Sequence, residues 1–227
     1  MRQMRGNRKM RCAFLLRVFA LAFGIALTPM VKAADISPSV ASQAEFESIL
    51  AAVLEQMDFE GVPEPPPEPG QKPRPHTRKG VVLVNETVEI CSASATPSCG
   101  ATESSELFLS QGLDAQIPRQ LRQELIAASA ISVQFDCPRL KLVQCERAAT
   151  ISSIFRGGGW WDDFYRKYPN TAGVVHFSNV VLSHDGTNAL LYVTHSCDGL
   201  CGTGNLVLLR KTNGRWVVEH REQLWIS

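Results

Sequence analysis

Six cysteines arranged as three closely spaced pairs constrain the fold of this 227-residue chain more than any other feature. In an oxidising compartment an even set of cysteines favours disulfides, and pairing near neighbours closes the shortest loops. Each such disulfide contributes on the order of 2–3 kcal/mol and fixes the geometry of its loop. Strand twist could instead bring Cys91 near Cys137. The local pairs that we predict are Cys91–Cys99, Cys137–Cys145 and Cys197–Cys201.

An Arg-rich leader indicates where these disulfides form. Basic residues precede an apolar run over 18–27, and small residues follow up to Ala33. These are the parts of a signal peptide, so we predict one over 1–33 and a periplasmic or secreted bacterial protein. The apolar run of about ten residues is shorter than the roughly 20 that span a bilayer. Because Cys12 precedes this run, it is not a lipoprotein cysteine, and we expect a soluble chain with no stable membrane anchor after cleavage.

The charge balance changes when the leader is removed. The chain has 23 Lys and Arg against 22 Asp and Glu, and residues 1–33 contain seven of the basic residues and no acidic one. Cleavage therefore leaves 16 basic and 22 acidic residues, a net charge of −6. Nucleic-acid binding requires a clustered basic face, so we expect no nucleic-acid partner.

Two segments are predicted to precede the main domain. Within 34–61, apolar residues recur every three or four positions, the period of one helix face. Ser42 and Glu45 form a capping box, and Gly61 supplies the stop. We expect this amphipathic helix to dock on the main domain, with partner binding as the alternative. Proline-rich residues 62–79 predict a stiff, solvated linker, with a docking ligand as the less common alternative.

Residues 80–227 are predicted to form one disulfide-bonded α+β domain. A strand is expected from Val81 to Ile90, a helix beginning at Pro118, and a strand over 131–135. Asn213-Gly214 allows positive φ at both positions of a tight hairpin. Short connections favour an antiparallel four-stranded C-terminal meander packed by helices. Its strands are expected at 174–182, 189–195, 206–211 and 215–225.

A concentration of aromatic residues precedes the meander. On a helix, Trp161, Phe164, Tyr165 and Tyr168 would share one face because they are three or four positions apart. We expect this face to pack in the core. Trp160 is then left over as a candidate ligand contact.

The last cysteine pair could instead belong to a metal or redox site. His195, Cys197 and Cys201 are close enough to supply zinc ligands, with His220 as a possible fourth. The three-residue spacing between the cysteines differs from a thioredoxin-type pair, however, and no second pair has zinc-ribbon spacing. We therefore predict a structural disulfide, with no metal and no cofactor.

Candidate site residues surround this pair. Four histidines offer bases, but no motif such as Gly-x-Ser-x-Gly organises them with a nucleophile, so no catalytic residue is assigned. The nearby glycines do not open a helix, which argues against a phosphate site and for a mobile hairpin tip that could bind a partner. The candidate binding residues are Trp160, His195, Asp198, Gly199, Gly202 and Gly204.

The C-terminal 70 or so residues combine several short motifs. They include Trp161-Asp162-Asp163-Phe164-Tyr165, Tyr168-Pro169, Ala189-Leu190-Leu191-Tyr192-Val193, Leu200-Cys201-Gly202, Gly214-Arg215-Trp216 and Trp225-Ile226-Ser227. In combination these resemble a group of small exported bacterial proteins of uncharacterised function. The resemblance implies a fold unit and no catalytic assignment. A curved meander is also similar to NTF2-like and cystatin-like layouts, which implies a shape and not a function.

Two functions fit these observations. We expect a non-catalytic binding module, such as an inhibitor, adaptor or immunity-type factor, whose partner is an unknown protein or envelope component. The alternative is a small hydrolase or ligand-binding enzyme that uses His195 and Asp198. The alternative requires the two side chains to converge in a closed pocket with a shifted pKa.

Overall fold

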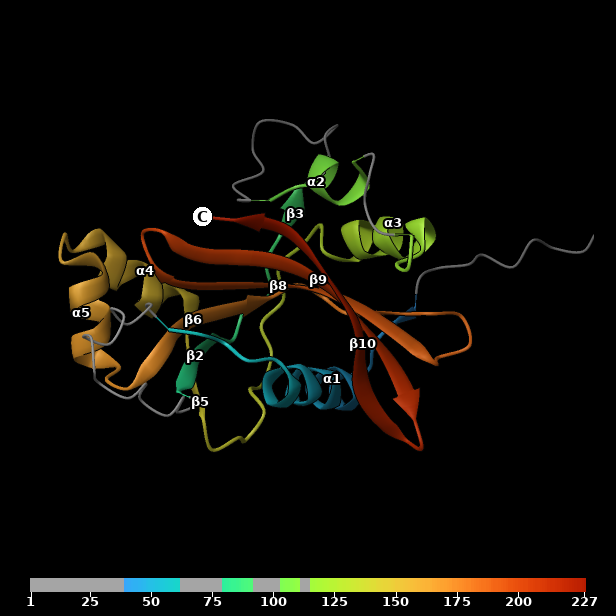
Figure 1. Cartoon of the computed structure of the whole chain (residues 1–227), viewed down its shortest axis with the longest axis horizontal. Coiled ribbons are helices and arrows are strands. Elements are labelled where there is room, and N and C mark those ends of the chain that lie inside the picture. Colours follow the sequence, from blue (N-terminus) through green and yellow to red (C-terminus); the bar gives the residue numbers. More distant parts are fainter. Residues whose placement is uncertain (1–38, 62–78, 92–102, 111–114) are drawn as a thin grey trace, which may run out of the picture. The chain divides into compact units, whose positions relative to one another are not determined.

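A computed structural model describes residues 39–61, 79–91, 103–110 and 115–227, and the described elements form a mixed sheet with helices on both faces (Figure 1). The predicted α+β class is confirmed at this level. The predicted signal peptide, nearly all of the proline-rich linker and Cys99 lie outside the described residues.

The C-terminal part of the sheet is an antiparallel meander, as predicted, but the strand predicted over 174–182 is broken into two strands. Its neighbouring strands are β6 (Thr171–Phe177), β8 (Asn188–Asp198), β9 (Cys201–Thr212) and β10 (Arg215–Ile226), each antiparallel to the next. Asn213 and Gly214 adopt φ values of 50° and 77° in the β9–β10 turn, as expected for a tight hairpin. Short strand β7 (Val181–Leu182) pairs with β8, and β1 (Ser39–Val40) pairs with β7.

The sheet extends beyond the meander through parallel strands, which the sequence analysis did not predict. Strand β2 (Gly80–Val84) lies between β6 and β5 (Val143–Glu146) and is parallel to both. Residues 81–84 are buried on both faces, as in a parallel strand covered on two sides. The predicted strand over 81–90 is therefore shorter. Its last residues belong to β3 (Ile90–Cys91), which pairs with β4 (Glu103–Ser104).

Helix α1 (Gln43–Gln56) covers one face of the sheet (Figure 1). It begins as predicted, since the Ser42 hydroxyl accepts a hydrogen bond from the Glu45 backbone N–H at 3.4 Å. It ends before Gly61, however, because the backbone is already extended at Met57. Met57 and Phe59 are both buried, and alternate residues of an extended segment point to the same side. The predicted stop at Gly61 is therefore wrong.

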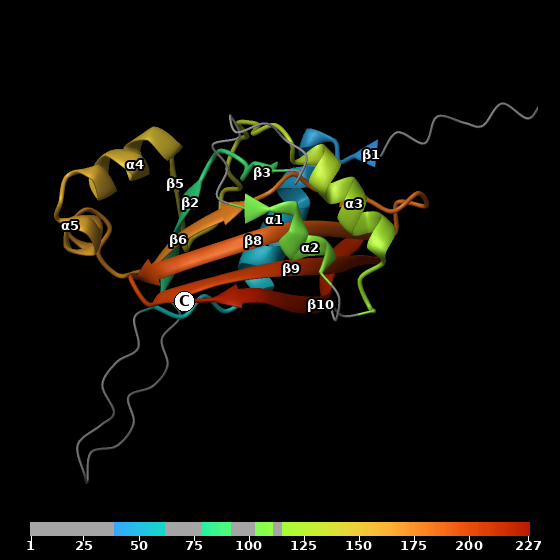
Figure 2. The same cartoon turned by 90° about the horizontal axis from the view of Figure 1, so that it is seen from above.

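The other helices cover the opposite face (Figure 2). Alternate residues of β8 show this, because Leu191 packs in the α1 core whereas Tyr192 packs with α2 and α3. On β2, Val82 packs with α4 and α5 on that same opposite face. The bounds are α2 (Ser105–Leu109), α3 (Arg119–Ala128), α4 (Ala148–Arg156) and α5 (Trp160–Lys167).

Two further predictions about this region need correction. Pro118 is the N-cap of α3 and not its first helical residue. The strand predicted over 131–135 does not form, and only Gln134 makes a single bridge to Glu86. Ile131 and Val133 are 73% and 50% exposed and only Phe135 of this run is buried, so the run lacks a continuous buried face that would select a paired strand.

Two of the predicted disulfides are confirmed. Cys137–Cys145 has a Cα–Cα distance of 6.0 Å and Cys197–Cys201 one of 5.1 Å. The pairing of Cys137 excludes the Cys91–Cys137 alternative. The Cys91–Cys99 pair stays a prediction, because Cys99 lies outside the described residues. Within the described ranges, no helix is both long and apolar enough to cross a membrane.

Candidate functional site

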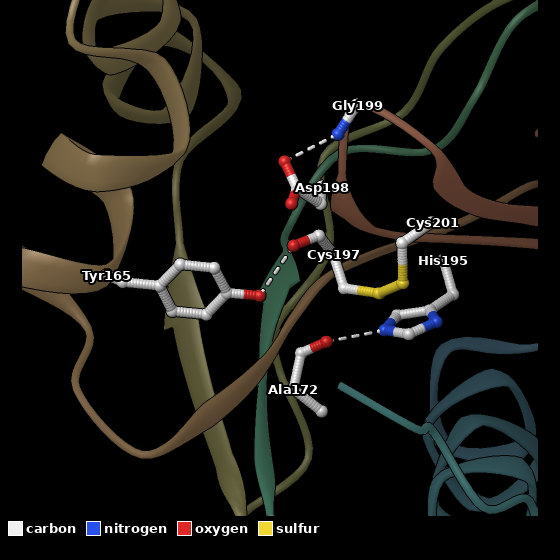
Figure 3. Close-up of a disulfide and its surroundings, with 7 residues drawn as sticks. All are labelled: Tyr165, Ala172, His195, Cys197, Asp198, Gly199 and Cys201. Carbon is white, nitrogen blue, oxygen red and sulfur yellow. Dashed lines mark hydrogen bonds between the residues drawn. A yellow bond between two sulfur atoms is a disulfide. The ribbon is translucent and has the colours of Figure 1, made fainter. Parts of the chain in front are cut away.

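The Cys197–Cys201 disulfide closes the turn between β8 and β9 (Figure 3). Cys197 is fully buried and Cys201 is partly exposed. Gly173 of β6 permits the close approach of this turn, because a Cβ there would lie 2.1 Å from the Ser196 carbonyl oxygen. Gly173 also has a φ of +117°, which side-chain-bearing residues rarely adopt. The end of β8 is therefore fixed by the disulfide and by close packing on β6.

His195 lies on the α1 side of β8. Its Nε2 is 2.8 Å from the Ala172 carbonyl oxygen, and because a carbonyl only accepts, Nε2 carries the hydrogen (Figure 3). Its ring contacts Phe59 edge to face, with 5.4 Å between centroids. Burial lowers the pKa of His195, although the bond to Ala172 acts in the opposite direction. The imidazole is therefore neutral at pH 7, with a lone pair on Nδ1.

Asp198 is turned away from His195. Its carboxylate accepts a hydrogen bond from the Gly199 N–H at 2.7 Å (Figure 3). Burial and, second, the charge of Asp198 raise the pKa of Tyr165 to about 12. The Tyr165 hydroxyl donates to the Cys197 carbonyl oxygen at 2.7 Å, which ties α5 to the turn. Asp198 thus belongs to the α5 side of the turn, and the structure does not bring it together with His195.

The three glycines have different surroundings. Gly202 and Gly204 lie within β9 and not in a loop, so the predicted mobile tip is shorter than expected. A Cβ on Gly204 would lie 2.1 Å from Nε1 of Trp225, and one on Gly202 would be 3.1 Å from the same ring. Only Gly199 lies in open space. Gly202 and Gly204 therefore make room for Trp225, whose Nε1 donates to the Tyr192 hydroxyl at 2.6 Å.

The predicted aromatic face is confirmed. Phe164 is fully buried, Tyr168 is 5% exposed, and Trp161 packs edge to face on Phe155 with 4.9 Å between centroids. Trp160 begins α5 and is 61% exposed, as expected of the residue left over. It does not line the pocket described next.

A pocket of 440 Å³ opens beside the disulfide, and we call it the His195 pocket. Of the predicted site residues it contains His195 and Gly202, and Cys201 also lines it. Its other polar residues could not be predicted from the sequence, because they come from the segment after α1, from β9 and from the end of the chain with β10, which are far apart. These are Asp58, Glu60, Thr203, Asn205, Arg221, Gln223 and Ser227.

The His195 pocket combines charged and hydrogen-bonding groups. Asp58 and Glu60 supply negative charge, Arg221 supplies positive charge, and His195 presents a neutral imidazole. Hydroxyl and amide side chains add donors and acceptors. Among the described residues, no group of three or more His, Cys, Asp and Glu side chains is arranged to hold a metal.

No protein-family model, curated protein or solved structure matches this chain. The resemblance to small exported proteins of uncharacterised function therefore stays a prediction. Any function assigned to this chain must therefore be inferred from the geometry of the site.

Proposed function

We propose that this chain is an exported, soluble, non-catalytic binding module of the cell envelope or extracellular space, of the inhibitor, adaptor or immunity type. It engages a protein partner at the His195 pocket. The observation that carries the proposal is a polar pocket with charges of both signs, lined by strands and held by a disulfide.

The rim of the pocket supports a protein partner over a small polar ligand. Leu200 and Ile226 line the pocket and are 89% and 71% exposed. Protein interfaces combine apolar contacts with charged and hydrogen-bonding groups, and arginine is enriched among their energetically important residues. Arg221, in the same pocket as two exposed apolar side chains, fits this description.

The site is also preorganised. Thr203 and Asn205 lie on β9, and Arg221 and Gln223 lie on β10, its antiparallel neighbour, with a register shift between Gln223 and Trp225. The Cys197–Cys201 disulfide fixes the adjoining turn. Side chains on rigid strands lose less conformational entropy on binding than side chains on a flexible loop. The two observed disulfides suit the oxidising compartment that the leader predicts.

The enzyme alternative has less support. It required His195 and Asp198 to converge, but Asp198 accepts from the Gly199 N–H and interacts with Tyr165. Nε2 of His195 is already bonded to Ala172. The carboxylate that this alternative assigned to His195 therefore does not orient its imidazole, and a hydrolase needs a group that orients the base.

Site-specific photocrosslinking in the native compartment tests the proposal. A photoreactive amino acid replaces Leu200 at the pocket rim, and the matched control replaces Ile131, which is 73% exposed and outside the pocket. We expect a discrete protein adduct from position 200 and none from position 131. The same adducts from both positions, or none from position 200, would contradict the proposal.

A further inference from the structure

A second pocket, of 380 Å³, also lies beside the C-terminal end of α1 and shares no residue with the His195 pocket, although Phe59, which lines it, contacts His195. It is bounded by the end of α1, strand β2, and the segment that leads into β5. We call it the edge pocket. Its lining residues are Leu54, Glu55, Phe59, Lys79, Val81, Arg139, Leu140, Lys141, Leu142 and Val143.

The walls of the edge pocket are apolar. Leu54, Phe59 and Val81 belong to the buried α1 core, and Leu140 and Val143 pack against that core. The core is therefore continuous with the pocket, and an apolar ligand would extend it. An apolar group that leaves water here gains roughly 25 cal/mol for each Å² of surface that it buries.

Three cations lie on the same pocket. Lys79, Arg139 and Lys141 line it together with one acidic residue, Glu55. None of the ion pairs between described residues involves these three cations. The chain is acidic once 1–33 is removed, so this local excess of positive charge is opposite in sign to the net charge. An apolar pocket with an excess of cations complements a ligand that has an apolar tail and an anionic head.

The pocket is held in shape without a ligand. The Cys137–Cys145 disulfide closes the loop that carries Arg139 to Val143. The backbone N–H of Val81 donates to the Leu142 carbonyl oxygen at 2.8 Å, and a Cβ on Gly80 would lie 2.9 Å from that oxygen. Preorganisation of this kind lowers the entropic cost of binding.

We propose that the edge pocket binds an anionic amphiphile with an acyl chain, of which a fatty-acid carboxylate is the simplest. The acyl chain lies against Leu54, Phe59 and Leu140. The carboxylate pairs with Arg139 and Lys141, and Arg139 can hold it in a bidentate fashion. The proposal does not depend on the His195 pocket.

Calorimetric titration of laurate into the protein, expressed as the full chain and recovered after export, tests this site. We expect saturable binding of one laurate. Dodecyltrimethylammonium has an equally long chain but a cationic head, and it should bind at least about tenfold more weakly. Higher ionic strength should weaken laurate binding, since the cations are at the surface.

Paired variants locate the binding. Arg139→Gln with Lys141→Gln should weaken laurate binding about tenfold, a few-fold for each charge. The control, Arg119→Gln with Arg215→Gln, removes two exposed cations that line neither pocket and should leave the affinity unchanged. Leu142→Ser should also weaken binding, and because Leu142 is 44% exposed the fold should tolerate it, which unfolding curves check.

Four results would overturn the proposal. The first is no saturable laurate binding, and the second is equal affinity for the cationic amphiphile. The third is equal weakening by the edge-pocket variant and the control variant. Binding of a short acidic peptide without an acyl chain, in place of laurate, would assign the pocket to a protein segment and also overturn it.

Discussion

The His195 pocket and the edge pocket border the same sheet, but they are built from different strand pairings. The first lies on β9 and β10, long antiparallel strands that follow each other in the chain. The second lies where parallel strands β2 and β5 meet, and their residues are far apart in sequence. Charged groups of both signs line the His195 pocket, whereas apolar groups and an excess of cations line the edge pocket. One sheet thus presents two surfaces suited to different ligands.

The largest expected difference between the antiparallel and the parallel part of the sheet is the free energy of unfolding lost when an ion pair is broken. On the meander, Arg122 of α3 pairs with Glu222 of β10, with side chains only 3% and 9% exposed. Glu222→Leu leaves a buried guanidinium without its carboxylate and should cost about 3–5 kcal/mol of unfolding free energy in urea. Near the parallel strands, the Lys167–Glu146 pair is 46% and 23% exposed, so Lys167→Met should cost less than about 1 kcal/mol.

A double variant shows whether burial is the cause. Arg122→Met combined with Glu222→Leu removes both charges and should recover much of the loss of Glu222→Leu alone. Equal losses of unfolding free energy for Glu222→Leu and Lys167→Met would mean that burial of the ion pair does not distinguish the antiparallel from the parallel part of the sheet.

The disulfides offer a second comparison. The partners are eight residues apart in Cys137–Cys145 and four apart in Cys197–Cys201. Replacing either pair by serines should cost on the order of 2–3 kcal/mol in thermal or urea unfolding. Doubling the loop adds only about 0.6 kcal/mol, so the Cys137–Cys145 variant should be slightly less stable. A clearly larger loss for Cys197–Cys201 would show that packing of buried Cys197 dominates instead.

The smallest expected effect is a pH dependence of the unfolding free energy that arises from Glu146 of the parallel strand β5. The Tyr168 hydroxyl donates to Glu146 at 2.6 Å, and this bond is the main cause that lowers the Glu146 pKa to about 2. A carboxyl with a lowered folded-state pKa stabilises the protein above its unfolded pKa near 4.5. That stability is lost as the pH falls from about 4.5 towards 2. Because Glu146 is near solvent, we expect about 1 kcal/mol.

Two variants check this pH dependence. Urea unfolding between pH 5 and pH 2.5 should show a loss in the native protein that Glu146→Gln removes. Tyr168→Phe should reduce it. An unchanged pH profile in Glu146→Gln would assign the loss to other carboxyls.

Local signals in the sequence were sufficient for much of the meander. Asn213-Gly214 fixes a hairpin through its own backbone preferences, and Ser42 begins α1 through a bond to a residue three positions away. Two of the three predicted near-neighbour cysteine pairs are likewise present, with partners eight and four residues apart. These features depend on residues that are close in sequence.

The parallel end could not be predicted in the same way. The pairing of β2 with β5 joins Val81 to Val143, and no local pattern specifies that choice. Both pockets likewise depend on contacts between segments that are far apart in the sequence. Arg221 and Asp58 both line the His195 pocket although they are far apart in the sequence. Only the folded structure reveals that they share a site. From the sequence alone, Gly202 and Gly204 indicate a mobile hairpin tip. The sequence does not show that Trp225 packs on both glycines.

The central claim, that the His195 pocket binds a protein partner, is tested most directly by affinity for the partner crosslinked from position 200. Arg221→Glu places a charge reversal in the pocket, and Arg215→Glu places the same reversal at the other end of β10. We expect at least about tenfold weaker binding for Arg221→Glu and native affinity for Arg215→Glu. Equal affinities for the two variants would contradict it.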